Sequence, residues 1–422
     1  MKSLPKPSPL FERWALDPSV VYLNHGSFGA CPRDVLAHQS ELRAEMEREG
    51  VRWFVERVDD LLDESRATLA TLIHARPADL VFVPNATHGV ATALAALEPS
   101  LSPGDEILVT SHEYPGCMTN VRRTAARTGT NVITAPLVFP SAGPDEVVAV
   151  VLGAATSRTR VALISHITAP SALVLPLARI VPDLERRGIA VIVDGAHAAG
   201  QVRGLNVPTL GASFYTSNCH KWICSPKGSA FLHAREDRHA ALRPLCLSNF
   251  ADQPKHGRSR LHSDFDYVGT GDFTAYVAIG RAIDAMASIV GEEVGTSRHA
   301  GVEQWDEITR RNHDLVVVAR QRLCAALGIE PPAPDSMLGS MATLLLPTDP
   351  AHAARLAARP TRYHDALQDA LVDRHKIQVP VWSVTGDPRR LFRISAQLYN
   401  SVEQYDYLAG ALREELDRER SL

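Results

Sequence analysis

Short apolar runs alternate with segments of helical period between residues 75 and 235. Seven of these runs have the length and composition of buried strands, and they cover residues 80–83, 107–110, 132–134, 161–164, 190–193, 214–216 and 229–232. Leu177, Ile180, Val181 and Leu184 illustrate the helical period, because they fall on one face of a helix expected over 177–187. The alternation predicts an α/β fold, in which helices flank both faces of a mainly parallel seven-stranded sheet.

After a polar stretch over residues 248–267, the pattern becomes that of a smaller α+β unit. Long helical periods cover 275–290 and 302–327. A strand, a helix, two strands and a closing helix are then expected at 341–346, 364–373, 377–381, 391–395 and 402–418. Because 422 residues exceed the size at which one core keeps growing, we expect an N-terminal arm at 1–20, a large α/β domain at 21–275 and a small C-terminal α+β domain at 276–422.

Composition and charge argue against nucleic acid or a membrane as a partner. The formal net charge is −4 and charged residues make up 22% of the chain, so no basic surface is indicated. Residues 1–14 carry prolines and charges where a signal peptide needs an apolar core, and no apolar run is long enough to span a bilayer. We expect a soluble, cytoplasmic protein that acts on a small molecule.

The six cysteines are spaced as free thiols would be. No Cys-x-x-Cys pair occurs, which argues against a disulfide framework. Cys219, His220 and Cys224 offer three candidate zinc ligands, but no second ligand pair accompanies them. We therefore expect no metal site.

Polar residues follow two neighbouring predicted strands at the edge where α/β sheets bind ligands. Asp194 and His197 come directly after strand 190–193, and the next strand leads to Lys221. Asp194 by itself is equally well interpreted as the N-cap of a following helix. Lys221 lies beside Trp222 and an isoleucine, and a desolvated lysine has a lowered pKa and forms an imine with an aldehyde.

These residues match the needs of pyridoxal 5′-phosphate (PLP). Its aldehyde needs a lysine, its pyridine nitrogen needs a carboxylate, and its phosphate needs hydroxyl groups and backbone amides. Thr87 follows strand 80–83 and opens a helical run, and the N-terminus of a helix binds anions. A threonine in this place is more often only a cap, so Thr87 indicates the cofactor only in combination with Lys221 and Asp194.

Several further segments accompany these residues. In chain order, the set covers residues 22–29, 113–114, 194–197, 217–221, 269–272 and 392–400. Together they resemble the aminotransferase class V family of fold-type I PLP-dependent enzymes, and within it the isopenicillin N epimerase-like group. The resemblance spans about residues 20–415 in the family's order.

The resemblance implies a role for each matching residue around the cofactor. Lys221 is implied to carry PLP as a Schiff base, Asp194 to contact the pyridine nitrogen, and His197 to approach the phenolic oxygen. Tyr114 is implied to stack on the pyridine face, although a core tyrosine near a strand end is the alternative. The residues implied to hold the phosphate are Ala86, Thr87, Asn218 and His220.

The resemblance also implies a homodimer with shared active sites. Thr270 is implied to reach the phosphate bound by the neighbouring subunit, and two-fold dimers are the commonest assemblies. The alternative is that residues 269–271 form only a turn before the next helix. The polar stretch 248–267 is equally well interpreted as part of the substrate site or as a surface loop of the dimer.

Arg393 is implied to bind the α-carboxylate of the substrate. Its planar fork suits this task because it donates two parallel hydrogen bonds. Arg389 and Arg390 are expected to form the solvated start of the same strand. Asn24 and His25 are implied by the resemblance alone to line the substrate side.

The motifs do not separate transamination, epimerisation and β-elimination, since all three act at Cα. A persulfide-forming desulfurase needs a nucleophilic cysteine in the C-terminal region, but the last cysteine of this chain is Cys324. β-Elimination needs no such thiol, and the epimerase-like group includes carbon–sulfur lyases that act on S-substituted cysteines in specialised metabolism. We therefore predict a carbon–sulfur β-lyase, with an epimerase or a class V aminotransferase as alternatives.

Two other classes of function stay open. A nicotinamide- or metal-dependent enzyme is disfavoured, because no Gly-x-Gly-x-x-Gly follows the first strand and no set of metal ligands is complete. A non-catalytic PLP-binding protein is compatible with the sequence, although the intact Lys221, Asp194 and Arg393 argue against a loss of activity.

Overall fold

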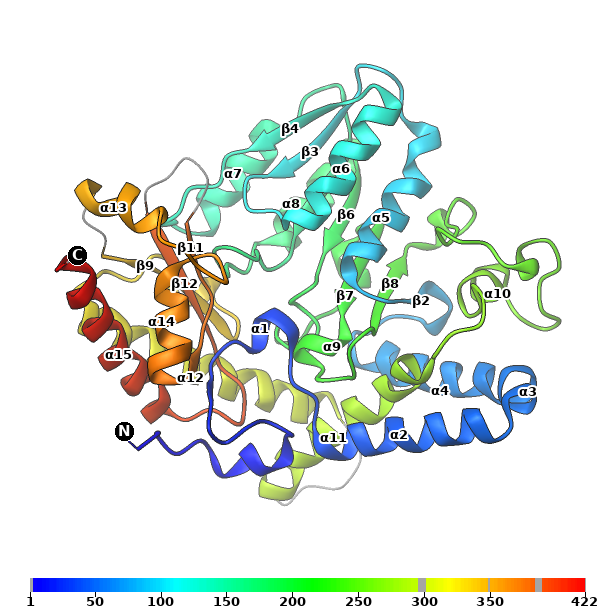
Figure 1. Ribbon diagram of the computed structural model, residues 1–422. Coiled ribbons are helices and arrows are strands. Elements are labelled where there is room, and N and C mark those ends of the chain that lie inside the picture. Colours follow the sequence, from blue (N-terminus) through cyan, green and yellow to red (C-terminus); the bar gives the residue numbers. More distant parts are fainter. Residues whose placement is uncertain (1–2, 295–300, 348–349, 384–388, 422) are drawn as a thin grey trace.

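A seven-stranded sheet forms the centre of the computed structural model, which describes residues 3–294, 301–347, 350–383 and 389–421 (Figure 1). Its strand order is β2-β8-β7-β6-β5-β3-β4. The strands are β2 (Leu80–Val83), β3 (Glu106–Thr110), β4 (Asn131–Ala135), β5 (Thr159–Ser165), β6 (Ala190–Asp194), β7 (Phe214–Asn218) and β8 (Ala230–Ala234). Only β8 runs antiparallel to its neighbours in this sheet. The predicted mainly parallel, seven-stranded sheet is confirmed.

Helices cover both faces of this sheet because its strands are apolar on both sides. Along β6, Val191 and Val193 pack into one hydrophobic cluster, whereas Ala190 and Ile192 pack into another on the opposite face. The predicted face of α8 is entirely buried against the first cluster. The helices that lie between successive strands are α5 (Ala86–Leu97), α6 (Pro115–Thr128), α7 (Pro144–Ala154) and α8 (Leu177–Arg186).

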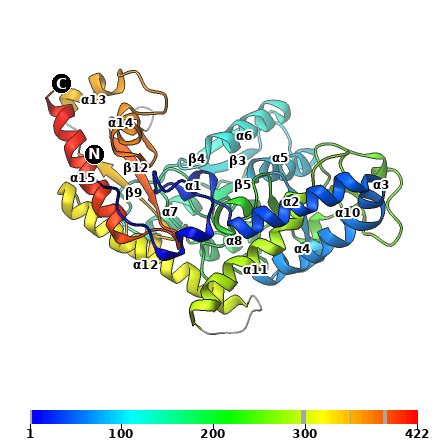
Figure 2. The same ribbon diagram turned by 60° about the horizontal axis from the view of Figure 1, so that its bottom comes forward.

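Helices from the N-terminal part and the middle of the chain pack together under the sheet. Figure 2 shows α2 and α4 alongside α11, and α11 contacts both of them. The sequence patterns had predicted α11 but neither α2 nor α4. The helices of this group and those nearby are α1 (His25–Phe28), α2 (Arg33–Arg48), α3 (Gly50–Arg52), a π-helix at Trp53–Arg57, α4 (Val58–Leu72), α9 (Cys219–Trp222), α10 (Arg260–Phe265) and α11 (Thr274–Val294).

The C-terminal part forms a smaller unit around an antiparallel sheet of order β11-β12-β9. The N-terminal strand β1 (Val21–Tyr22) pairs in parallel with β10, so the start of the chain is tied to this unit. Its elements are α12 (Val302–Leu327), β9 (Met341–Leu346), α13 (Pro350–Ala357), α14 (Ala366–His375), β10 (Ile377–Gln378), β11 (Val381–Ser383), β12 (Arg390–Ser395) and α15 (Val402–Arg420).

One predicted strand of this unit was wrong. A single strand was expected over 377–381, but β10 and β11 are separate and pair with β1 and β12 respectively. Pro380 lies between them, and a proline has no N–H with which to continue a ladder of hydrogen bonds. The domain boundary at residue 275 stays a prediction. It falls in the first turn of α11, and this helix belongs to the same hydrophobic cluster as α8.

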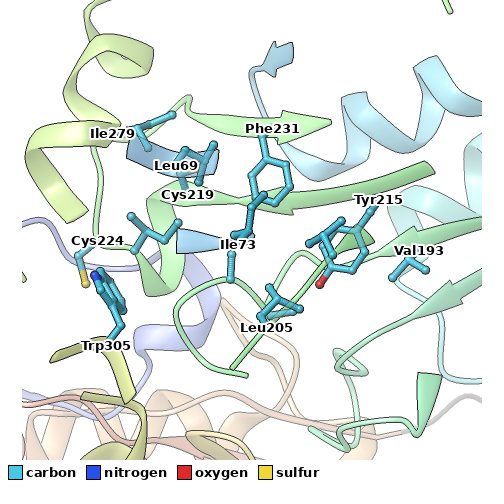
Figure 3. Close-up of a cluster of buried hydrophobic side chains, with 14 of the residues drawn as sticks. Leu69, Ile73, Val193, Leu205, Tyr215, Cys219, Cys224, Phe231, Ile279 and Trp305 are labelled. Carbon is cyan, nitrogen blue, oxygen red and sulfur yellow. The ribbon is translucent and has the colours of Figure 1, made fainter. Parts of the chain in front are cut away.

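The largest hydrophobic cluster runs from the sheet to the helices beneath it. In Figure 3, Val193, Tyr215 and Phe231 of the sheet lie in one cluster with Ile279 of α11 and Trp305 of α12. Cys219, the first residue of α9, and Cys224, which follows this helix, are embedded in this cluster as free thiols. None of the helices in the described ranges is long and apolar enough to cross a membrane.

Candidate active site

Lys221 and His197 meet at the C-terminal edge of the central sheet, as the sequence predicted for residues that follow β6 and β7. The Nζ of Lys221 lies 3.1 Å from the Nε2 of His197. Desolvation lowers the pKa of Lys221 to about 7, and the positive charge of Arg393 adds to this effect. Burial, followed by the charge of Lys221, holds the pKa of His197 well below its usual value. At neutral pH the site therefore holds a neutral imidazole beside an amine that is partly unprotonated.

Asp194 is a buried carboxylate at the end of β6. Its Oδ1 accepts a hydrogen bond from the N–H of Ala196 at 3.0 Å, and its Oδ2 accepts one from the thiol of Cys117 at 3.2 Å. No helix begins after Asp194, so the N-cap interpretation is wrong. Burial raises the pKa of Asp194, while its hydrogen bonds and the charge of Lys221 oppose that shift. A buried carboxylate of this kind gains from a cationic N–H donor.

The sequence analysis missed two buried groups that lie close to Asp194. Cys117 donates its hydrogen bond from α6, and Glu113 lies in the loop that precedes this helix. The Glu113 carboxylate accepts hydrogen bonds from the N–H and hydroxyl of Ser165 and from the hydroxyl of Thr110. Burial, followed among the raising effects by the charge of Asp194, raises the pKa of Glu113 to about 7. The segment 113–114 had been noticed only as part of the resemblance.

The N-terminus of α5 lies beside the end of β7, where a phosphate was predicted. The N–H of Ala86 donates to the Oδ1 of Asn218 at 2.8 Å, which leaves the amide N–H₂ of Asn218 turned away from that contact. Asn85 caps the helix by accepting from the N–H of His88 at 2.9 Å. The interpretation of Thr87 as the cap is therefore wrong.

His220 in α9 and Tyr114 just before α6 were also predicted to lie at the cofactor. The Nδ1 of His220 contacts the carbonyl oxygen of Ser229 at 2.9 Å, so Nδ1 carries the proton and Nε2 is unprotonated. Tyr114 is 47% exposed, which does not fit a core tyrosine. A Cβ on Gly116 would lie 2.8 Å from the Tyr114 ring and 3.5 Å from the methyl group of Thr87. The ring and Thr87 therefore border the same space.

Arg393 is a buried guanidinium that has no carboxylate partner among the described residues. One terminal nitrogen donates to the carbonyl oxygen of Ala169 at 2.7 Å, the other to the hydroxyl of Ser27 at 3.2 Å, and Nε has no partner there. Ser27 in turn donates to the Oδ1 of Asn24 at 2.7 Å. Burial lowers the pKa of Arg393 to about 10. A carboxylate ligand would supply the missing anion.

Arg390 differs from the sequence-based expectation. It was predicted to be solvated, but it is 3% exposed. Its guanidinium donates to both carboxylate oxygens of Asp365 and to both of Glu419, which α14 and α15 bring to the start of β12. These acidic partners are distant in sequence, and they allow the arginine to be buried. Arg389 is exposed, as expected.

Residues 24–29 contact the lysine segment directly. His25 is buried, and its Nε2 lies 2.9 Å from the carbonyl oxygen of Lys221. Gly29 has a φ of +70°, and a Cβ there would lie 2.0 Å from the carbonyl oxygen of His220. Only glycine fits at this approach between α1 and α9.

Thr270 lies on the exposed segment that follows α10. Its hydroxyl lies 3.0 Å from that of Tyr267, and among the described residues it forms no hydrogen bond with Lys221 within one protomer. The polar stretch before it folds into a 3₁₀ turn at Asn249–Ala251 and into α10. Lys255 of this stretch is paired with Asp59 of α4 at 2.8 Å. The predicted role of Thr270 thus concerns a second subunit.

Comparison with known proteins is consistent with this geometry. The family described as aminotransferase class-V matches residues 21–323. The chain is 33% identical over 417 residues to an isopenicillin N epimerase of Amycolatopsis lactamdurans, covering 96% of this chain and 97% of the relative. It is 29% identical over 419 residues to a probable chloroplastic L-cysteine desulfhydrase of Arabidopsis thaliana, covering 94% of this chain and 83% of that protein.

Solved structures share the fold. A cystine C–S lyase in complex with cysteine persulfide superposes with a TM-score of 0.73 at 21% identity, covering 94% of this chain and 97% of that one. A cysteine desulfurase from Thermococcus onnurineus superposes with a TM-score of 0.76 at 18% identity, covering 99% and 100%. At these identities the likeness concerns the fold.

The lowered pKa of Lys221 predicts how its reaction with an aldehyde depends on pH. Only the unprotonated amine attacks, so covalent uptake of PLP by the apoprotein should reach half its maximal rate near pH 7, where the pKa of Lys221 lies, instead of near 10.5. Uptake is measured as bound cofactor after borohydride reduction. Lys227→Ala should still take up PLP and Lys221→Ala should not. A midpoint above about 9 would show that the amine is not desolvated.

Proposed function

Because the chain belongs to the aminotransferase class-V family, whose members use PLP, we propose that it is a carbon–sulfur β-lyase acting on an S-substituted L-cysteine. One observation carries the proposal: the amine of Lys221, with its pKa lowered to about 7, lies near the buried carboxylate of Asp194 and the buried guanidinium of Arg393, which has no carboxylate partner in the part of the chain that the structure describes. The first two suit a cofactor, and the third suits an amino-acid substrate.

The donor set of the site fits PLP. Lys221 would hold the aldehyde carbon, Asp194 the pyridine N–H and His197 the phenolic oxygen. The N-terminus of α5, with Thr87 and Asn218, would hold the phosphate, and His220 would join them by taking up a second proton at Nε2. Tyr114 would cover the ring. When bound, the cofactor withdraws electrons from the Cα of an attached amino acid and so weakens the bonds around it.

The chain's own side chains supply binding and proton transfer. Arg393 binds the α-carboxylate and thereby fixes the orientation of the Cα–H bond. Lys221, once released, takes the proton from Cα, since an amine with a pKa of about 7 exchanges protons at neutral pH. Cys117 and the N–H of Ala196 donate to Asp194, and these hydrogen bonds favour its ionised form against the effect of burial.

The named activities of the relatives support elimination over persulfide formation. Two of them are an L-cysteine desulfhydrase and an isopenicillin N epimerase. A thiol that accepts sulfur must be exposed, yet five of the six cysteines are buried. The exposed one, Cys246, precedes α10 and does not belong to the C-terminal region where a desulfurase has its nucleophile. An epimerase or a class V aminotransferase remains the alternative, and a role in specialised metabolism is part of the proposal.

The reaction type is tested with S-alkyl and S-glycosyl cysteines. The PLP-loaded enzyme should release one pyruvate, one ammonium ion and one thiol per substrate consumed, and Lys221→Ala should release none. Pyruvate and ammonium are measured by coupled assays and the thiol by a chromogenic disulfide. Solvent deuterium at Cα with inversion and no pyruvate would identify an epimerase, whereas a requirement for a 2-oxo acid would identify an aminotransferase.

Removing the guanidinium of Arg393 should weaken substrate binding without releasing the cofactor. For Arg393→Ala we expect unchanged visible absorbance and a kcat/KM about 100-fold lower, mainly through KM, since a charge-assisted hydrogen bond contributes about 1.5–3 kcal/mol. Arg389→Ala, at the exposed position just before β12, is the matched control and should stay within about two-fold of the wild type. An unchanged KM for Arg393→Ala would contradict the role.

We infer that the enzyme is a homodimer in which Thr270 reaches the partner's phosphate site. Leu245 and Leu247, which precede α10, and Val268, which follows it, are exposed apolar residues, and Cys246 contacts the carbonyl oxygen of Val268. Exposed apolar residues that lie close together suit an interface. Sedimentation should show a dimer, and Thr270→Ala should raise the dissociation constant for PLP about 10-fold, as expected for one lost hydrogen bond to a charged group. A fully active monomer would refute the shared site.

A further inference from the structure

The imidazole of His25 bridges the small C-terminal unit and the lysine segment. Its Nε2 lies 2.9 Å from the carbonyl oxygen of Lys221, and its Nδ1 lies 2.9 Å from the hydroxyl of Tyr399. The ring is completely buried and packs against the ring of Trp222 at a centroid distance of 4.8 Å. Both ring nitrogens are therefore engaged inside the protein.

The contact with the carbonyl oxygen decides the tautomer of His25, because at 2.9 Å it is shorter than the contacts of the same Nε2 with the amide nitrogen of Gln397 at 3.5 Å and with the thiol of Cys224 at 3.8 Å. A carbonyl oxygen only accepts hydrogen bonds, so Nε2 of His25 must carry the proton that faces Lys221. In the neutral ring Nδ1 is then an acceptor, and the hydroxyl of Tyr399 donates to it. Burial, followed by the charges of Lys227 and Lys221, lowers the pKa of His25 to about 3 and keeps the ring neutral.

The main chain at Lys221 depends on this contact because α9 is a single turn. A helix of four residues leaves its carbonyl groups without the usual partners inside the helix. The carbonyl oxygen of Lys221 accepts from the N–H of Cys224 at 3.1 Å and from His25. Its two lone pairs are thus both used, once within the large unit and once by α1.

We propose that His25 is a positioning residue for Lys221: Nε2–H holds the lysine's carbonyl oxygen, and Tyr399 fixes the required tautomer. Because the side chain of Lys221 is long, a small rotation of its backbone moves Nζ by a larger distance. By fixing the backbone, this contact keeps Nζ close to Nε2 of His197. The inference rests on the proposed function only in that Lys221 is the cofactor lysine. It differs from the sequence-based prediction, in which His25 lines the substrate side.

The experiment compares two amides at position 25. In His25→Gln the amide nitrogen occupies the place of Nε2 and can still donate to the carbonyl oxygen, whereas in His25→Asn it falls one bond short. PLP uptake by the apoprotein is measured against pH, because its midpoint reports the pKa of Lys221. The charged or titratable groups that face this amine are Asp194, His197, Arg393 and Cys117, and neither variant changes them.

His25→Gln should match the wild type in its uptake midpoint. In His25→Asn the amine gains water, so the midpoint should rise by at least about half a pH unit, and kcat should fall about 10-fold while KM stays within about two-fold. Equal midpoints for the Asn and Gln variants would overturn the proposal. So would a raised KM with unchanged kcat, which marks a substrate-binding residue.

Tyr399→Phe tests the same idea without changing His25. Loss of the hydroxyl removes the donor that stabilises the Nε2–H tautomer of His25, so the midpoint should move in the same direction by a smaller amount. An unchanged midpoint would overturn the proposal even if His25→Asn fails to fold. Tyr407→Phe removes a hydroxyl that donates to another carbonyl oxygen, that of His375, and should change nothing. The uptake measurement needs no substrate, so its result does not depend on whether the enzyme is a lyase.

Discussion

The desolvated amine of Lys221 is the constraint on which the rest of the site depends. An amine in water stays protonated at neutral pH, and a protonated amine neither attacks an aldehyde nor removes a proton. Keeping it unprotonated requires an apolar, rigid surrounding, which the cluster around Cys219 and Cys224 provides. The positive charge of Arg393 adds to this effect, whereas the buried carboxylate of Asp194 opposes it.

Arg390 and Arg393 illustrate the difference between an arginine that stabilises the fold and one that is available to bind a ligand. Both are buried on β12, three positions apart. Arg390 has two carboxylate groups of the protein as partners, whereas Arg393 has only neutral acceptors among the residues that the structure describes. A buried charge without an opposite charge is destabilising, so the guanidinium of Arg393 favours the binding of an anion. A substrate carboxylate supplies that negative charge, and this makes binding selective for acids.

The sequence was sufficient where a signal is local. Apolar runs located all seven strands of the central sheet, and the rule that ligands bind beyond strand ends brought Asp194 and Lys221 to one edge. It was insufficient where partners come from distant segments. The burial of Arg390 depends on Asp365 and Glu419, and the buried position of His25 depends on Tyr399. The break between β10 and β11 at Pro380 was also a local signal, but apolar residues continue on both sides of the proline and had suggested a single strand.

The pairing of β1 with β10 has a mechanical consequence. Because this pairing attaches the start of the chain to the small unit, α1 must travel with that unit in any rigid-body rotation. Such a rotation moves Ser27 and Arg393 together, so the hydrogen bond between them, at the proposed site for the substrate carboxylate, is kept. His25, however, is held at the backbone of Lys221 in the other unit. The hinge of any such rotation therefore has to lie close to the imidazole of His25.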